Sequence, residues 1–65
     1  MPQTTKRVLV VDDSAFMRGL VTEIVEFRHD FRVVGTAANG VQAIDRVRAL
    51  SPDIVTLDIM MPLMD

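Results

Sequence analysis

The chain has 65 residues, so it can form at most one small domain, and a domain of this size buries roughly 60% of its unfolded surface. It contains no cysteine, which excludes disulfides and thiolate metal sites, and its net charge of -2 gives no indication of nucleic-acid binding. No apolar run approaches the roughly 20 residues that a membrane helix needs, and the polar start lacks the apolar core of a signal peptide. We therefore expect a cytoplasmic protein without membrane or nucleic-acid partners.

Residues 1–6 are expected to form a disordered lead, and residues 7–11 to form the first strand. The last four residues of this strand are apolar and three are β-branched, which is typical of a parallel strand buried on both faces. Asp12 and Asp13 follow directly. In an open α/β sheet, ligands bind outside the carboxyl ends of the strands, so chemistry is expected at these two acids.

Two helices and two further strands are expected beyond this point. Apolar residues recur at helical spacing in both helices, and Ser14 or Asp13 is expected to cap the first, while Asn39 belongs to the entry of the second. Strands that alternate with helices imply a parallel sheet with right-handed crossovers, and therefore an α/β fold in the order βαβαβ. The expected elements are a helix from Ala15 to about Phe27, a strand over 31–37, a helix over 41–50 and a strand over 53–57.

Asp12, Asp13 and Asp58 end two strands that point the same way, so their side chains should converge if those strands are neighbours. Two unit charges about 4 Å apart repel by about 4 kcal/mol at an effective dielectric of 20, and a proton or a cation relieves this repulsion. An all-oxygen cluster without a nearby His or Cys suits a hard ion, and Mg²⁺ fits best. Asp58 also lies in an otherwise nearly apolar run, where an ionised carboxylate is costly. One reason for a carboxylate at this position is nucleophilic catalysis, in which it attacks a phosphoryl group and forms an acyl phosphate.

Less specific interpretations stay open for each residue. Asp12 and Asp13 are also typical of acids at a helix N-terminus, and Asp58 is typical of a residue that starts a turn. His29, the only histidine, is expected on the surface in a connection opposite the acidic edge. Solvated positions are expected for Arg18, Arg46 and Arg48, and packing against structure beyond this segment for Met60, Met61 and Met64.

As a combination, these motifs resemble a response-regulator receiver domain, and the segments 12–18 and 56–58 resemble most narrowly the receiver of chemotaxis protein-glutamate methylesterases. The resemblance implies a flavodoxin-like (CheY-like) fold, of which residues 7–65 are the N-terminal half, with a three-stranded parallel sheet in the order 2-1-3. The motifs that carry it are residues 8–14, Asn39-Gly40 with Ala43, and residues 52–62.

The resemblance also implies the roles of individual residues. Asp58 would be the phosphoacceptor and a metal ligand, Asp13 would ligate Mg²⁺ directly, and Asp12 would contribute partly through water. The main-chain carbonyl of Met60 would be a further ligand. The phosphoryl donor would be a histidine kinase, and the parent protein would be a switch for an output domain rather than a turnover enzyme.

The implied family fold has five strands, so the third strand of this segment would expose an apolar edge, and we expect a homo-oligomer that forms through this edge. One alternative function is a folding or assembly module without phosphorylation. Another is a phosphatase of the haloacid-dehalogenase type, which also uses an aspartyl phosphate. That family needs Asp-x-Asp on its first strand, whereas here Asp12 and Asp13 are adjacent.

Overall fold

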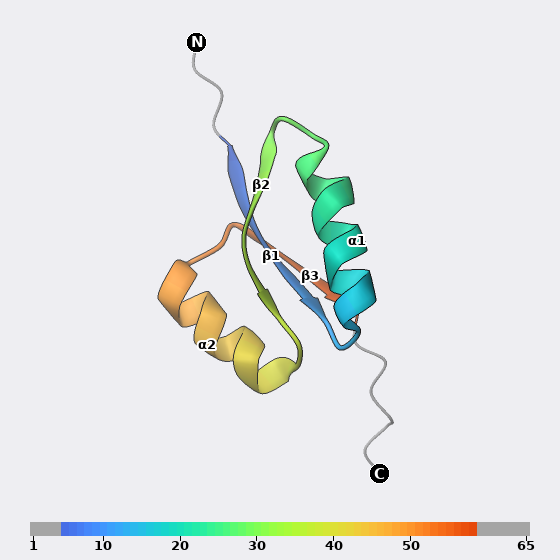
Figure 1. The fold of residues 1–65 in the computed structure, drawn as a ribbon. Helices are drawn as coiled ribbons and strands as arrows, with labels where there is room; N and C mark the ends of the chain where they lie inside the picture. Colours follow the sequence, from blue (N-terminus) through green and yellow to red (C-terminus); the bar gives the residue numbers. More distant parts are fainter. Residues whose placement is uncertain (1–4, 59–65) are drawn as a thin grey trace.

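The computed structural model describes residues 5–58, in which strands and helices alternate in the predicted βαβαβ order (Figure 1). The first strand begins within the expected disordered lead, because the Lys6 N–H donates to the Asp30 carbonyl at 2.9 Å and joins the sheet. The other boundaries agree with the sequence to within one residue. The elements are β1 (Lys6–Asp12), α1 (Ala15–Glu26), β2 (Phe31–Ala37), α2 (Gly40–Leu50) and β3 (Ile54–Asp58).

The three strands form a parallel sheet, as the alternation of strands and helices predicted, in the order β2-β1-β3 that the family resemblance implied. β1 pairs with β3 in an unbroken register that begins with Val8 opposite Ile54 and ends with Asp12 opposite Asp58. The pairing with β2 shifts between Val8 and Leu9, where β2 carries one extra residue. The regular register on the β3 side therefore fixes which residues end side by side at the carboxyl edge of the sheet.

The core of the molecule is the central strand β1. Val8, Leu9, Val10 and Val11 are each at most 2% exposed, because β1 has a strand on each side and a helix on each face. α1 covers one face of the sheet and α2 covers the other (Figure 1). The four apolar residues thus meet the two-faced burial that their sequence indicated.

Side-chain caps define where both helices begin. The Ser14 hydroxyl accepts a hydrogen bond from the Met17 N–H at 3.2 Å, and the Asn39 side chain accepts one from the Gln42 N–H at 2.9 Å. α2 ends at Ser51, which has a left-handed backbone with φ of 48°. Arg7 donates from its guanidinium to the carbonyls of Leu50 and Ser51, so a cation stabilises the negative end of this helix.

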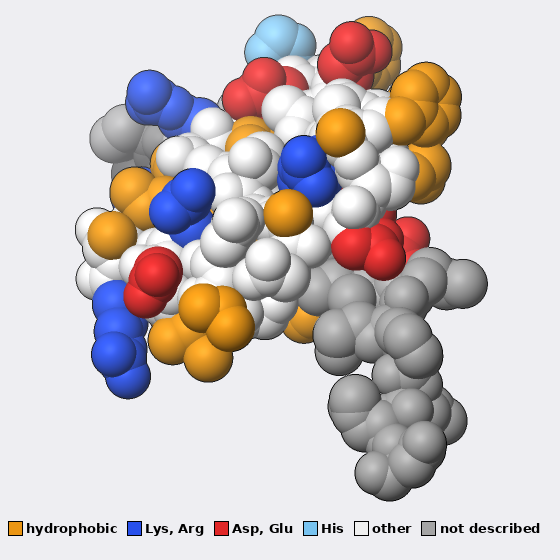
Figure 2. Space-filling view, turned by 60° about the horizontal axis from the view of Figure 1, so that its bottom comes forward, with side chains coloured by type: hydrophobic (Ala, Val, Ile, Leu, Met, Phe, Trp, Pro, Cys, Tyr) orange, Lys and Arg blue, Asp and Glu red, His pale blue; other side chains and the backbone are white. Residues whose placement is uncertain are grey.

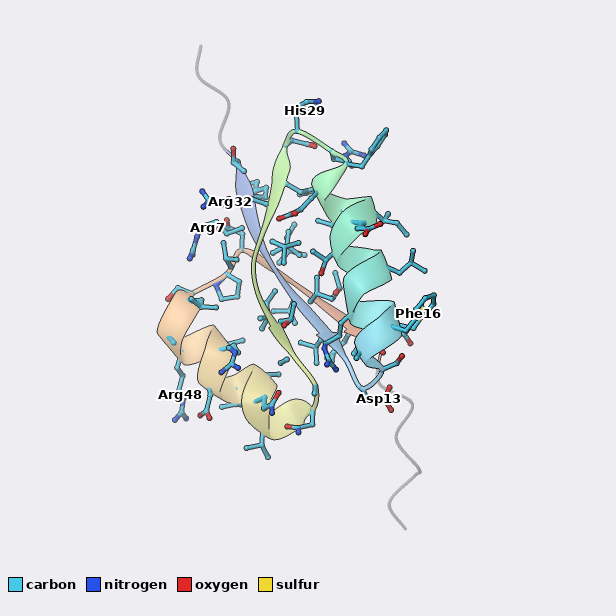
Figure 3. The ribbon with its side chains drawn as sticks, viewed as in Figure 1. Arg7, Asp13, Phe16, His29, Arg32 and Arg48 are labelled. Carbon is cyan, nitrogen blue, oxygen red and sulfur yellow. The ribbon has the colours of Figure 1, made fainter. Side chains whose placement is uncertain are left out.

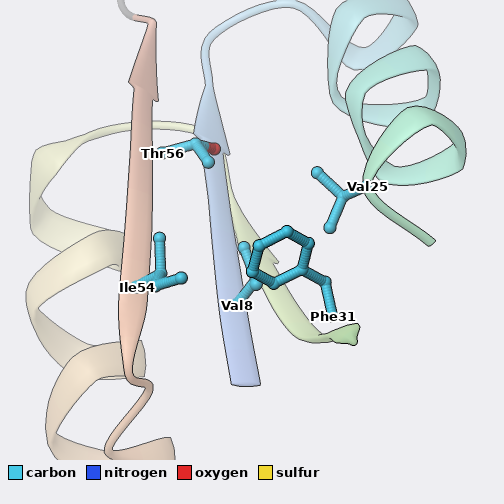
Figure 4. A pocket seen from close by; sticks show the side chains of 5 residues that line it. All are labelled: Val8, Val25, Phe31, Ile54 and Thr56. Atoms are coloured by element: carbon cyan, nitrogen blue, oxygen red, sulfur yellow. The ribbon is translucent and has the colours of Figure 1, made fainter. Parts of the chain in front are cut away.

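In contrast to β1, the third strand is largely uncovered. Neither helix packs against β3 in the described part of the chain, and Leu57 is 63% exposed. On the α1 side, an open apolar hollow of about 100 Å³ separates β3 from the helix (Figure 4). The residues that line it are Val8, Val25, Phe31, Ile54 and Thr56.

Adding a side chain at Gly35 and at Gly19 should change the stability of the fold in opposite directions. A Cβ at Gly35 would lie 2.6 Å from Leu50 Cδ1 and 3.6 Å from Leu9 Cδ1, so Gly35→Val should destabilise the fold by about 1–3 kcal/mol through overpacking. A Cβ at Gly19 in α1 meets nothing within 4 Å, so Gly19→Ala should stabilise it by up to about 1 kcal/mol. Urea unfolding followed by circular dichroism measures both values. Equal effects of the two substitutions would contradict the close packing of α2 on β2.

Candidate functional site

The carboxyl edge of the sheet brings Asp12 and Asp58 together, although they are far apart in sequence. They are direct partners in the β1–β3 register, and neighbouring strands lie about 4.8 Å apart. Partners in a parallel register project from the same face of the sheet, which here is the face covered by α1. The backbone therefore places both residues on one side of the sheet at one edge.

Asp12 is a buried carboxylate that is only partly satisfied. It is 3% exposed, and its Oδ1 accepts a hydrogen bond from the Ser14 N–H at 3.0 Å. Its Oδ2 is buried, and no hydrogen-bond partner for it occurs among residues 5–58. An ionised oxygen that is buried without a partner is costly, and a bound cation would satisfy it. The donor chemistry at this position therefore fits a hard cation.

Asp13 is exposed and lies at the tip of the β1–α1 turn, beyond the end of the strand (Figure 3). β1 ends at Asp12 and the backbone bends at Asp13, so Asp13 does not continue the strand and its side chain lies at the outside of the turn. Consistent with this, residues 5–58 contain no group of three or more His, Cys, Asp or Glu side chains placed to hold a metal ion. The structure thus brings two of the three predicted acids into register, while the side chain of the third points elsewhere.

The exposure of Asp58 differs from the expectation based on its apolar neighbours. Asp58 is exposed, because no helix covers β3 in the described chain. The buried carboxylate is instead that of Asp12. An exposed carboxylate at the edge of the sheet is accessible to a large reactant. Met60, whose carbonyl is the remaining expected ligand, lies outside the described residues.

Arg18 is not the solvated residue that the sequence suggested. It is half-buried, and its guanidinium donates to the main-chain carbonyl of Asp12 at 2.9 Å. The helical spacing contains a signal for this position, because Arg18 lies seven residues before the partly buried Val25 and therefore shares its sheet-facing side. Arg46 also donates to a strand carbonyl, that of Thr36, at 3.1 Å, although it remains exposed.

The opposite end of the molecule has ordinary surface chemistry. His29 lies in the exposed connection between α1 and β2, as expected (Figure 3). Beside it, Arg28 pairs with Asp30 at 3.0 Å. Hydrogen bonding to Arg28 lowers the pKa of the Asp30 carboxyl, and hydrogen bonding to Asp30 raises the pKa of Arg28. Both side chains are exposed, so this pair contributes little to the stability of the fold.

A buried acid at the end of the central strand, in register with an acid on the next strand, is the arrangement expected of a receiver. The family model of the response regulator receiver domain matches residues 8–65. The chain belongs to the response regulator receiver family. Its three-stranded sheet in the order 2-1-3 with two helices is accordingly a CheY-like receiver fold.

Two curated relatives carry the same protein name. The protein named protein-glutamate methylesterase/protein-glutamine glutaminase is 52% identical in Bacillus licheniformis and 58% identical in Moorella thermoacetica, each over 59 residues. Both matches cover 91% of this chain. The chain spans only 16% and 14% of the length of these relatives, so it corresponds to their receiver portion and not to the remainder.

Two solved structures have the same fold. The response regulator domain of Thermotoga maritima CheB gives a TM-score of 0.84 at 46% identity, covering 94% of this chain and 46% of that one. CheY6 from R. sphaeroides, solved in complex with the P1 domain of CheA3, gives a TM-score of 0.83 at 41% identity. That match covers 95% of this receiver and 49% of the other chain. Among the described residues, no helix has the length and apolar character needed to cross a membrane.

Because the Oδ2 of Asp12 is buried without a hydrogen-bond partner, removal of the charge of Asp12 should stabilise the fold. Asp12→Asn keeps an acceptor for the Ser14 N–H and replaces a buried charge by a neutral amide, whose unpartnered N–H group offsets part of the gain. We therefore expect the free energy of unfolding in EDTA to rise by about 1 kcal/mol. The same variant should lose any stabilisation by Mg²⁺. Thermal unfolding with EDTA and with MgCl₂ measures both effects. A variant that is less stable in EDTA would show that the charge of Asp12 is already compensated within the protein.

Proposed function

We propose that this receiver accepts a phosphoryl group on Asp58 from a phosphohistidine of a histidine kinase, and that this reaction switches an output domain in chemotaxis. The observation that carries the proposal is the register of Asp12 with Asp58, together with the unpartnered Oδ2 of Asp12. The match to the receiver family and the similarity to chemotaxis methylesterases support it.

The residues at the carboxyl edge fit a Mg²⁺ site. Asp12 offers a buried oxygen without a partner, and Asp58 lies beside it on the neighbouring strand. Asp13, at the exposed turn directly after Asp12, and the main-chain carbonyl of Met60 are the remaining proposed ligands. When bound, Mg²⁺ neutralises charge on the transferring phosphoryl group.

The exposed carboxylate of Asp58 is the proposed nucleophile. One of its oxygens forms a bond to phosphorus while the phosphorus–nitrogen bond of the phosphohistidine breaks. The electron pair of that bond returns to the imidazole, which takes up a proton, and Asp58 becomes an acyl phosphate. Because Asp58 is exposed and no helix among residues 5–58 packs against β3, a protein donor can approach it directly.

A phosphodonor domain of a histidine kinase is the partner that this proposal implies. The similar receiver CheY6 was solved with the P1 domain of CheA3, which supports a partner of this kind. The cytoplasmic location expected from the sequence is part of the same proposal, since the donor and the receiver must meet there.

Asp58→Asn should abolish phosphorylation of the chain. Incubation with acetyl phosphate and MgCl₂ should add one phosphoryl group to the original sequence, detected by intact-mass spectrometry, because the small donor needs only the acceptor and the cation. Asp45→Asn is the matched control, since Asp45 is exposed on α2 and away from the carboxyl edge. An adduct that persists in Asp58→Asn, or no adduct in the original chain, would contradict the proposed function.

Self-association is a second candidate function, favoured by the open edge of β3. The described sheet leaves β3 without a neighbour on one side, and two of its apolar side chains, Val55 and Leu57, are exposed. An unpaired apolar strand is a template for pairing with another chain. We propose a symmetric pair of chains joined through their β3 edges.

Leu57→Lys should shift the 65-residue chain from dimer towards monomer, because a charge on an edge strand opposes pairing between strands. Sedimentation velocity across a concentration series measures the shift. Val41→Lys is the control, because Val41 is an exposed apolar residue on α2 rather than on the edge strand. A folded monomer at high micromolar concentration in the original sequence would eliminate this candidate.

A further inference from the structure

The turn that carries Asp12 and Asp13 is tied to α1 at both of its ends. At its last residue, Ser14 caps the helix through Met17, and its carbonyl accepts the Arg18 N–H at 2.9 Å. At its first residue, the Asp12 carbonyl accepts the guanidinium of Arg18 at 2.9 Å. Arg18 therefore contacts the turn at both points, once through its backbone and once through its side chain.

The partner of this guanidinium is a main-chain carbonyl, although carboxylates lie close by. Among residues 5–58, the only ion pair within 4.0 Å is that of Arg28 with Asp30, so Arg18 forms none with the acids at the edge. An arginine paired with those acids would compete with a cation for their oxygens. Bonded to the Asp12 carbonyl, Arg18 leaves the Oδ2 of Asp12 available.

This carbonyl belongs to the peptide group that joins Asp12 to Asp13. A planar peptide held by a hydrogen bond at its oxygen has a fixed orientation, and it therefore fixes where the backbone of Asp13 begins. The backbone of Arg18 is also bonded to the next turn of the helix, because the Thr22 hydroxyl donates to the Arg18 carbonyl at 2.7 Å. The restraint thus extends from the second turn of α1 to the turn that carries both acids.

We propose that Arg18 is a positioning residue that holds the Asp12–Asp13 peptide in the orientation required to bind a divalent cation. This inference depends on the proposed function, because it concerns the same edge of the sheet. It gives Arg18 a role at the cation site although its side chain touches neither the cation nor the phosphoryl group.

Two effects of removing Arg18 have opposite signs, which makes the proposal testable. Loss of a positive charge near the acids would strengthen Mg²⁺ binding, whereas loss of positioning would weaken it. Outer-shell partners of metal ligands typically contribute 10–100-fold to affinity. We therefore expect Arg18→Met to weaken Mg²⁺ binding by roughly tenfold or more, and Arg18→Lys, which keeps the charge and one donor, to recover part of that loss.

Isothermal titration of the 65-residue chain with MgCl₂ measures these affinities. Arg46→Met is the matched control, because it also removes one positive charge and one bond from an arginine to a strand carbonyl. It should leave Mg²⁺ binding within about twofold of the original value, since Arg46 holds no peptide of the acidic turn. Circular dichroism establishes whether each variant is folded. If Arg18→Met is unfolded, Arg18→Lys still tests the proposal.

Amide hydrogen exchange in EDTA gives a second measurement that does not depend on the cation. The Ser14 N–H donates to Asp12 within the turn, so Arg18→Met should reduce its protection while amides in the middle of α1 keep theirs. A purely structural role for Arg18 would lower protection across all of α1 instead.

The outcomes separate this inference from the proposed function. If the original chain binds Mg²⁺ and Arg18→Met binds it equally well or more tightly, the role of Arg18 is refuted while the phosphorylation site stands. If the original chain neither binds Mg²⁺ nor accepts phosphate from acetyl phosphate, the proposed function fails and the role of Arg18 fails with it.

Discussion

The parallel pairing of β1 with a strand on each side is the interaction on which the rest of the molecule depends. It buries Val8 to Val11 almost completely, and these residues form most of the core of a very small domain. The same pairing sets the register that brings Asp12 opposite Asp58. A slip of one residue would turn the side chains of one strand to the other face of the sheet. Stability and the geometry of the site therefore have the same origin.

The burial that stabilises β1 also buries the carboxylate of Asp12 at the end of the strand. Asp12 is carried into the interior with only one of its oxygens satisfied, and the neighbouring turn is held by a helix cap and by Arg18. Proteins often keep such unsatisfied groups at functional sites, where a ligand completes them. The capped turn and the unsatisfied oxygen of Asp12 are the observations from which the cation site is proposed.

The outer parts of the described molecule are much more exposed than its centre. Apolar side chains are exposed at several separate places on the face shown in Figure 2. The strongly exposed apolar residues on α1 include Phe16, Ile24 and Phe27. The edge strand β3 adds Val55 and Leu57 to the exposed apolar surface. Surfaces of this kind mark places where other protein normally packs. The similarity to receivers of about twice this length is consistent with that interpretation.

The sequence by itself determined the order of the elements, the buried central strand and the family, because these follow from local patterns: apolar runs, helix caps and adjacent acids. Only the tertiary structure decided that Asp12, rather than Asp58, is the buried carboxylate, and that Arg18 bonds to the Asp12 carbonyl instead of facing solvent. The physical reason is that burial at a strand end depends on which elements pack over it. Here α1 packs over β1 and β2, while no described helix packs over β3, and no local pattern specifies that difference.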